Sequence, residues 1–217
     1  MVCDELLPGR RTRNGNRVEI GRFQTLHDDG RRLIISWFER ALGYRDCVPE
    51  ESFEPFIFAW LAFNAWAACV TEADRDVEWK YSLMVCPEIN RHFDDLRSDQ
   101  EGALAGCVHE FAQQWPIFKA QELRRRRVHF QGTRHHVVEQ YLDADICFFE
   151  PQCARRHRQA GAAIPEDWPH TLSALYRTRC NLFHGEKASF ADADQLIVWN
   201  AFRVLTTFLE LSGYLGR

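Results

Sequence analysis

Apolar residues recur every three to four positions along most of this chain, a spacing typical of helices with one buried face. The first such segment covers 31–42, and Gly43 directly after it favours a helix end. The second covers 52–70, where Ser52 is a suitable N-cap and the following residues are apolar nearly all round. The last covers 192–214. We therefore expect 52–70 to form the central buried helix of the fold.

The chain between these segments shows the same period in shorter stretches. It predicts helices at 73–85, 88–96, 100–115, 117–127 and 134–149. Residues 151–165 are basic and irregular, which predicts a surface loop. A further helix is predicted at 168–183, with Asp167 as its cap.

These elements predict an all-α protein built as an antiparallel helix bundle. The chain has 217 residues, of which 46% are hydrophobic, so one sizeable core is expected. Residues 1–30 are polar and weakly periodic, and they are interpreted as an N-terminal arm. Residues 31–217 are expected to form a single domain, in which 72–166 is a variable helical and loop insertion.

Composition narrows the cellular setting and gives little about the ligand. A net charge of −4 gives no global nucleic-acid signature. Of the 27 basic residues, all but Lys80, Lys119 and Lys187 are arginine, which grips phosphate well, although a high-GC genome produces the same bias. The eight cysteines are scattered along the chain. The hydrophobic pattern predicts no membrane span and no secretory signal. We expect a cytoplasmic protein with reduced thiols.

Candidate chemistry lies at Arg179 and His184. Five residues along a regular helix turn a side chain by about 140°, so the pair can converge only if the helix ends between them or two copies meet. Gly185 favours such an end. A guanidinium binds a phosphodiester in bidentate fashion, and a neutral imidazole transfers protons near pH 7. The pair would suit attack of an RNA 2′-hydroxyl on its own phosphate, but cations at a helix end are also common decoration.

The stretch that holds this pair resembles a known superfamily. Residues 175–187 read Leu-Tyr-Arg-Thr-Arg-Cys-Asn-Leu-Phe-His-Gly-Glu-Lys and precede an apolar final helix. They are similar to the HEPN signature (higher eukaryotes and prokaryotes nucleotide-binding domain), in which Arg-x4-6-His lies between helices of a bundle. The aromatic stretch 58–66, with Phe63-Asn64, is similar to a helix that accompanies this signature.

The resemblance implies a HEPN-like helical bundle, frequent homodimerisation and, in many members, metal-independent endoribonuclease activity. Such members are toxins or antiviral-defence effectors, often beside a nucleotidyltransferase antitoxin. Carried across, Arg179 would hold phosphate and His184 would transfer protons. Cys180 departs from the pattern, because catalytic members usually carry a polar residue directly after the arginine. The supporting residues implied are Tyr176, Asn181, Lys187 and Asn64, the last of which is alternatively a satisfied core amide.

A second basic group could follow an RNA backbone electrostatically. Its members are arginines from two basic runs, with phenylalanines between the runs: Arg124, Arg125, Arg126, Arg127, Arg155, Arg156 and Arg158. The alternative is a solvated basic face balanced by nearby acids, namely Glu122, Glu139, Asp143, Asp145 and Glu150.

No metal or other cofactor is expected. Cys147, Cys153 and His157, with His135 and His136 nearby, include zinc-ligand types, but the tight Cys-x2-Cys spacing is absent. The acidic pairs at 166–167 and 192–194 are interpreted as helix caps, which disfavours a magnesium nuclease.

Three functions therefore remain open from the sequence. The first is a metal-independent HEPN-type endoribonuclease that acts on RNA as a homodimer, with a possible antitoxin or other defence-system partner and no membrane. The alternative is a non-catalytic scaffold that binds a nucleotide, RNA or a partner. The third is a purely structural helical protein.

Overall fold

The computed structural model describes residues 17–99, 102–125, 127, 138–140, 148–183 and 192–216. These residues are predominantly helical, which confirms the expected all-α class. The described strands are β1 (Ile117–Phe118) and β2 (Phe149–Glu150), which pair antiparallel with Ile117 opposite Glu150. The fold is therefore a helical assembly that carries one short two-stranded antiparallel sheet, β1 with β2, which we call the hairpin.

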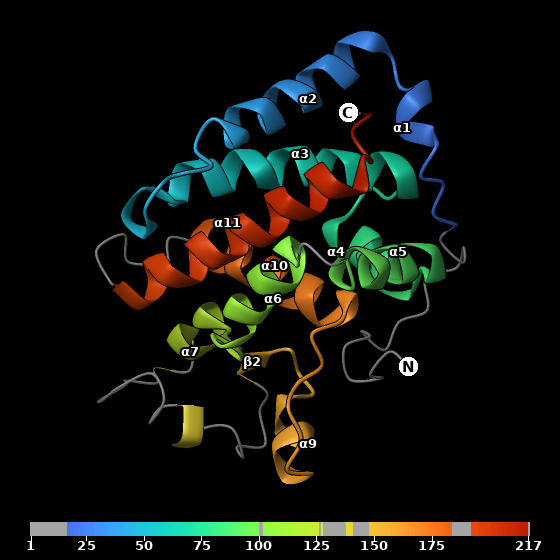
Figure 1. Ribbon diagram of the computed structural model, residues 1–217. Coiled ribbons are helices and arrows are strands. Elements are labelled where there is room, and N and C mark those ends of the chain that lie inside the picture. The colour runs from blue at the N-terminus through green and yellow to red at the C-terminus, as the bar shows by residue number, and fades with distance from the viewer. Residues whose placement is uncertain are drawn as a thin grey trace.

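Three long helices form successive layers in Figure 1: α2 (Asp28–Leu42), α3 (Phe53–Thr71) and α11 (Asp192–Ser212). α2 and α3 run antiparallel. α3 and α11 run in the same direction, as two contacts between them show. Near the first residues of both helices, Ser52 Oγ donates a hydrogen bond to the carbonyl of Gln195, and near their last residues Trp66 stacks on Tyr214. The other described helices are α1 (Arg22–Thr25), η2 (Pro49–Glu51), α4 (Asp76–Val85), α5 (Pro87–Arg97), α6 (Ala103–Ala112), α7 (Ala120–Arg125), α9 (Ala154–Gln159) and α10 (Trp168–Phe183).

The core is aromatic and is centred on α3, as the all-round apolar pattern predicts. Phe63 is fully buried, and its ring lies 5.7 Å from the centroids of Trp60, Trp66 and Trp79 and 6.1 Å from that of Trp168. These rings come from α3, α4 and α10. Burial of several large aromatic side chains dominates the stability of such a core.

α3 is also the one described helix that is long and apolar enough to cross a membrane by length and composition. Half of its most apolar window is buried inside the fold, where it contacts α2, α4 and α11. A central helix that is covered by other helices of its own chain has this same composition.

Residues 17–30 differ from the expected loose arm. Phe23 on α1 is fully buried, and the amide of Glu19 donates to the carbonyl of Val70 at 2.8 Å. Arg22 forms an ion pair with Glu72 just after α3. These contacts pack this part of the arm against the end of α3. Helix α2 then begins at Asp28, three residues before the expected start.

The middle of the chain also departs from its periodicity. The predicted helix at 117–127 is strand β1 followed by α7, since Ile117 and Phe118 pair with β2. Most of the predicted helix at 134–149 lies outside the described residues, and its last residue belongs to β2. The predicted loop 151–165 contains α9, whose cap Cys153 and first residue Ala154 are buried. Apolar runs of this length suit a strand as well as a helix, and tertiary contacts decide between them.

Candidate active site

Helix α10 positions the side chains of the predicted site. It begins as predicted, because the Asp167 carboxylate accepts a hydrogen bond from the backbone amide of His170 at 3.1 Å. Further along, Tyr176 packs against Trp60 of α3 and Trp79 of α4, with ring centroids 6.1 and 6.0 Å apart. Burial, with Cys180 and Asp76 nearby, raises the pKa of Tyr176, so its phenol stays protonated near neutral pH.

Arg179 lies one turn before the end of α10, in a polar and aromatic setting. Its Nη2 is 3.2 Å from Asp76 Oδ2 on α4, and its guanidinium carbon lies 4.8 Å from the Phe183 ring centroid. Only 23% of the Arg179 side chain is exposed. The guanidinium is thus held at the protein surface by an acid and a ring, with part of it open to solvent.

The partners of Arg179 in the predicted site lie outside the described residues. These are His184 and Lys187, which follow Phe183, the last described residue of α10. Whether Arg179 and His184 converge therefore stays a prediction. Cys180 is buried beside Tyr176, so its position faces the protein interior.

Two amides named as supporting residues have different surroundings. The Asn181 side chain donates to the Phe118 carbonyl at 2.7 Å and accepts from the Ala120 amide at 3.3 Å. It thereby fastens β1 and the start of α7 to α10. The Asn64 Oδ1 atom is buried and has no hydrogen-bond partner within the described chain, unlike a satisfied core amide.

A buried carboxylate, Glu150, lies beside this corner, although one of the two interpretations of the basic segment put it on a solvated face. Glu150 is 5% exposed, and its carboxylate accepts from Ser173 Oγ at 2.8 Å. The ammonium of Lys119 is 3.4 Å away and a guanidinium nitrogen of Arg177 is 3.7 Å away. Lys80 completes what we term the Glu150 cluster: Glu150, Lys80, Lys119, Ser173 and Arg177.

The charges of this cluster shift one another's protonation. Burial raises the pKa of the Glu150 carboxyl, but Lys80, Lys119 and Arg177 and the Ser173 hydroxyl outweigh burial and leave that pKa below its ordinary value. Burial lowers the pKa of Lys80, and its ammonium lies 4.8 Å from the Tyr176 ring centroid. The sequence contains one indication that Glu150 is buried, because Glu150 directly follows the apolar residues Phe148 and Phe149.

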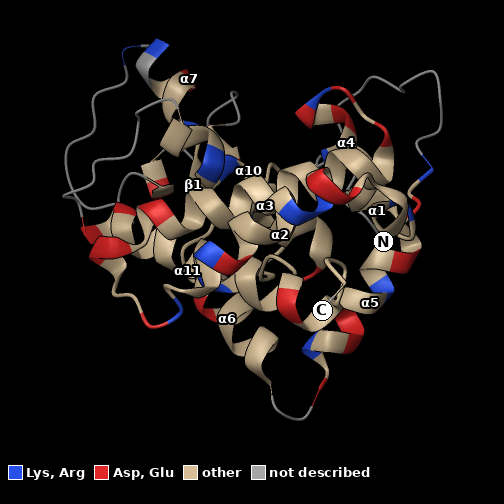
Figure 2. Cartoon of the chain, turned by 90° about the horizontal axis from the view of Figure 1, so that it is seen from above, with Lys and Arg blue, Asp and Glu red and all other residues tan. Residues whose placement is uncertain are grey.

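The corner has an excess of positive charge among the described residues. Lys80, Lys119, Arg177 and Arg179 face the carboxylates of Glu150 and Asp76. Figure 2 shows blue segments on α10 next to β1. A local excess of cations at a partly open surface attracts phosphate groups even when the whole chain is acidic.

The predicted RNA-binding arginines are described only in part. Arg125 pairs with Glu122 at 3.2 Å, and Arg158 pairs with Glu139 at 3.1 Å. Arg127, Arg155 and Arg156 are exposed, whereas Arg126 and the side chain of Arg124 lie outside the described residues. Exposed pairs of this kind favour a balanced, solvated face, and Glu150 does not belong to it because it is buried.

At the opposite end of α10, Cys153, His157 and His170 form a group whose side chains could hold a metal ion.

Comparison with family models, with curated proteins and with solved structures finds no match to this chain.

Proposed function

We propose that this protein is a metal-independent endoribonuclease of the HEPN type. The observation that carries the proposal is the position of Arg179, held by Asp76 and Phe183 near the end of α10 and five residues before His184. The excess of cations around it supports binding of a phosphodiester. The resemblance of 175–187 to the HEPN signature supplies the assignment of roles.

In the proposed reaction, Arg179 binds the non-bridging oxygens of the scissile phosphate. The neutral imidazole of His184 accepts the proton of the adjacent 2′-hydroxyl, and the 2′-oxygen bonds to phosphorus. The bond from phosphorus to the 5′-oxygen breaks, and that oxygen takes up a proton. The products are a 2′,3′-cyclic phosphate and a 5′-hydroxyl end, and DNA is not cleaved because it lacks the nucleophile.

The test is cleavage of a labelled RNA oligonucleotide in EDTA by the wild type, Arg179→Ala and His184→Ala. Loss of the general base should slow cleavage by about 10²–10⁴-fold. Arg45→Ala is the matched control, because Arg45 is an exposed arginine that pairs with Glu210 of α11 and has no proposed role in RNA binding. An oligonucleotide with one 2′-deoxyribose at the cut site should resist cleavage there.

Circular dichroism in EDTA must show folded protein in each assay. Cleavage that disappears on chelation of the folded protein, or that persists in both active-site variants, would contradict the proposal.

A second candidate is a module that binds RNA or a protein partner without turnover. The observation that favours it is the ion pair with Asp76, which occupies the guanidinium of Arg179. Asp76→Asn removes this competitor. The nuclease predicts faster cleavage by the Asp76→Asn protein, whereas the binding module predicts tighter RNA binding and no product.

The partners that we propose are RNA, a second copy of this chain and an antitoxin or other defence-system subunit. Phe183 is exposed at the described end of α10, where a second copy could cover it. Sedimentation of the wild type and Phe183→Ser tests the homodimer, since a dimer that forms at this end should dissociate more readily in the variant.

A further inference from the structure

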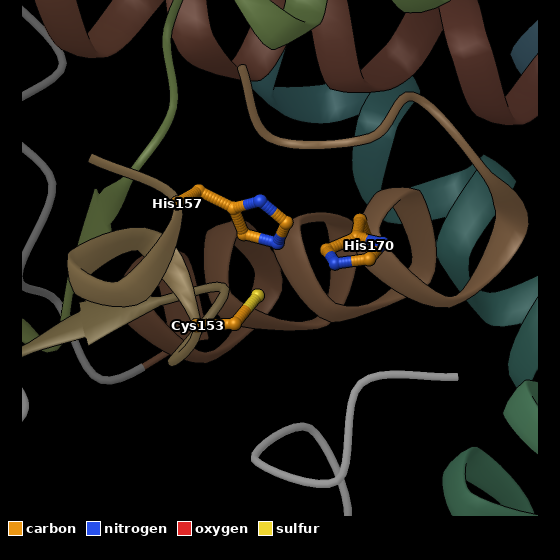
Figure 3. A group of neighbouring side chains, drawn as sticks. All are labelled: Cys153, His157 and His170. Atoms are coloured by element: carbon orange, nitrogen blue, oxygen red, sulfur yellow. The ribbon is translucent and has the colours of Figure 1, made fainter. Parts of the chain in front are cut away.

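Cys153, His157 and His170 gather where α9 meets the first turn of α10. One ligand atom from each residue lies within 4.8 Å of the others. Figure 3 shows the sulfur of Cys153 pointing toward the space between the two imidazole rings, whose centroids are 5.9 Å apart. The group joins two segments that are separated in the chain by the loop 160–167.

The backbone already arranges two of these side chains for a common ligand. Cys153 caps α9, and the amide of His157 donates to the carbonyl of Cys153 at 3.1 Å. Residues four apart on a helix lie on the same face, one turn above the other. Their thiol and imidazole are therefore presented together toward α10.

His170 supplies the independent observation that points to a ligand. It is 2% exposed, and its Nδ1 lies 2.5 Å from Asp167 Oδ1. Its Nε2 is buried and has no hydrogen-bond partner among the residues that the structure describes. A metal-binding histidine usually donates one ring N–H to a carboxylate, which orients the ring and leaves the other nitrogen for the ion.

The chemistry of the group selects the metal. One thiolate and two imidazoles suit zinc, whereas magnesium and calcium prefer oxygen ligands. Zn–N and Zn–S bonds of about 2.1 and 2.3 Å place tetrahedral N and S ligand atoms roughly 3.4–3.6 Å apart. The atoms that are up to 4.8 Å apart therefore need to close by about an ångström. Cys153 is completely buried, so a substrate could not reach it as a nucleophile.

We propose that Cys153, His157 and His170 bind one zinc ion, which fastens α9 to the start of α10. Solvent supplies the fourth ligand from the side of His157, the least buried of the three. The ion has a structural role. His170 is nine residues from Arg179, about 13 Å along the helix, so the zinc site is separate from the proposed nuclease corner.

The test begins with the metal-free full-length protein, to which Zn²⁺ or Co²⁺ is added. One equivalent of Co²⁺ should give a thiolate-to-cobalt charge-transfer band in the near ultraviolet, and Zn²⁺ should displace it. Zinc at 100-fold excess over its Kd should raise the Tm by roughly 5–10 °C. Binding that is absent, or that leaves the Tm unchanged, overturns the proposal.

Variants locate the site. Cys153→Ser should abolish the cobalt band, and His157→Gln should weaken zinc binding by at least about 10-fold. Asp167→Asn keeps a residue that caps helices and should weaken zinc binding by roughly 10–100-fold. Cys107→Ser is the control, a buried cysteine on α6, and it should bind zinc like the wild type.

His157 is only partly buried, so its variant carries the test even if Cys153→Ser does not fold. A cobalt band that survives in folded Cys153→Ser, zinc affinity unchanged in His157→Gln, or a band lost in Cys107→Ser each overturns the assignment. RNA cleavage by the zinc-loaded protein is a separate readout, because the zinc site is independent of Arg179.

Discussion

The aromatic core around α3 and the Glu150 cluster are both buried, but they are built in opposite ways. The core places Phe63 among tryptophans that gain from any dense contact. The Glu150 cluster places one carboxylate among cations from α4, α10 and the chain next to β1. The core depends on filled volume, whereas the cluster depends on each charge keeping its partners.

This difference predicts how each region responds to substitution. A core of large rings tolerates a change of shape if volume is nearly kept. A buried charge cluster tolerates a change of size but not the removal of one sign, because the remaining charges lose the attraction that offsets their desolvation.

The largest effect is expected from Phe63→Ala, which leaves a cavity in the centre of the core. We expect a loss of about 4 kcal/mol in the free energy of unfolding, measured by urea denaturation. Phe63→Leu is the matched control and should cost less than about 1.5 kcal/mol. Equal losses for both variants would show that the ring contacts, and not the volume, set the stability here.

Glu150→Gln should cause the next largest loss in the free energy of unfolding. The amide keeps the shape of the side chain but leaves Lys80, Lys119 and Arg177 without the central negative charge, at a cost of about 3 kcal/mol. Glu122→Gln, at the exposed pair with Arg125, should change stability by less than about 0.5 kcal/mol. Adding Lys119→Met to the Glu150→Gln protein should recover part of the loss, and simple additivity would contradict a charge cluster.

Asn181→Ala tests whether the hairpin is held to α10 by hydrogen bonds. The Phe118 carbonyl and the Ala120 amide lose their partner, which should cost about 2 kcal/mol in the same urea experiment. Asn181→Asp keeps the acceptor for Ala120 but places a carboxylate oxygen against the Phe118 carbonyl in a buried position, so it should cost at least as much. If both substitutions are neutral, the amide does not fasten the hairpin.

The smallest effect is expected in the acid dependence of stability. The pKa of Glu150 is lowered from 4.5, so the stability that the ionised carboxylate contributes is complete above that pH. It is lost as the pH falls through the folded pKa. Between about pH 5 and pH 3, the wild type should therefore lose stability more steeply than Glu150→Gln, and parallel curves would contradict this.

Much of the core was predictable because it comes from one continuous pattern. The apolar residues of 52–70 indicated the central helix, and the structure has α3 at Phe53–Thr71. Asp167 was predicted as the cap of the helix that is now α10, and it accepts from the backbone amide of His170. Local periodicity and capping are properties of neighbouring residues, so they can be read along the chain.

The polar clusters were not predictable in the same way. A solvated face was one of the two interpretations for Glu150, because nothing beside it in the chain shows that Lys80 and Arg177 surround it. The sequence disfavoured a metal because a Cys-x2-Cys spacing is absent, and His170, thirteen residues after His157, belongs to no such spacing. Tertiary folding brings such side chains together, and short spacing rules do not record it.

The pairing of Ile117 with Glu150 has a consequence for protein engineering. Because β1 and β2 are antiparallel partners, the chain leaves the bundle after Phe118 and returns to it at Phe149 in almost the same place. The residues after Ala120 and before Phe148 can therefore be exchanged for a short turn, or for a foreign peptide, at little cost in loop closure. Lys119 and Ala120 stay, because they contact Glu150 and Asn181. The hairpin is thus a natural grafting point, next to the surface where we place RNA.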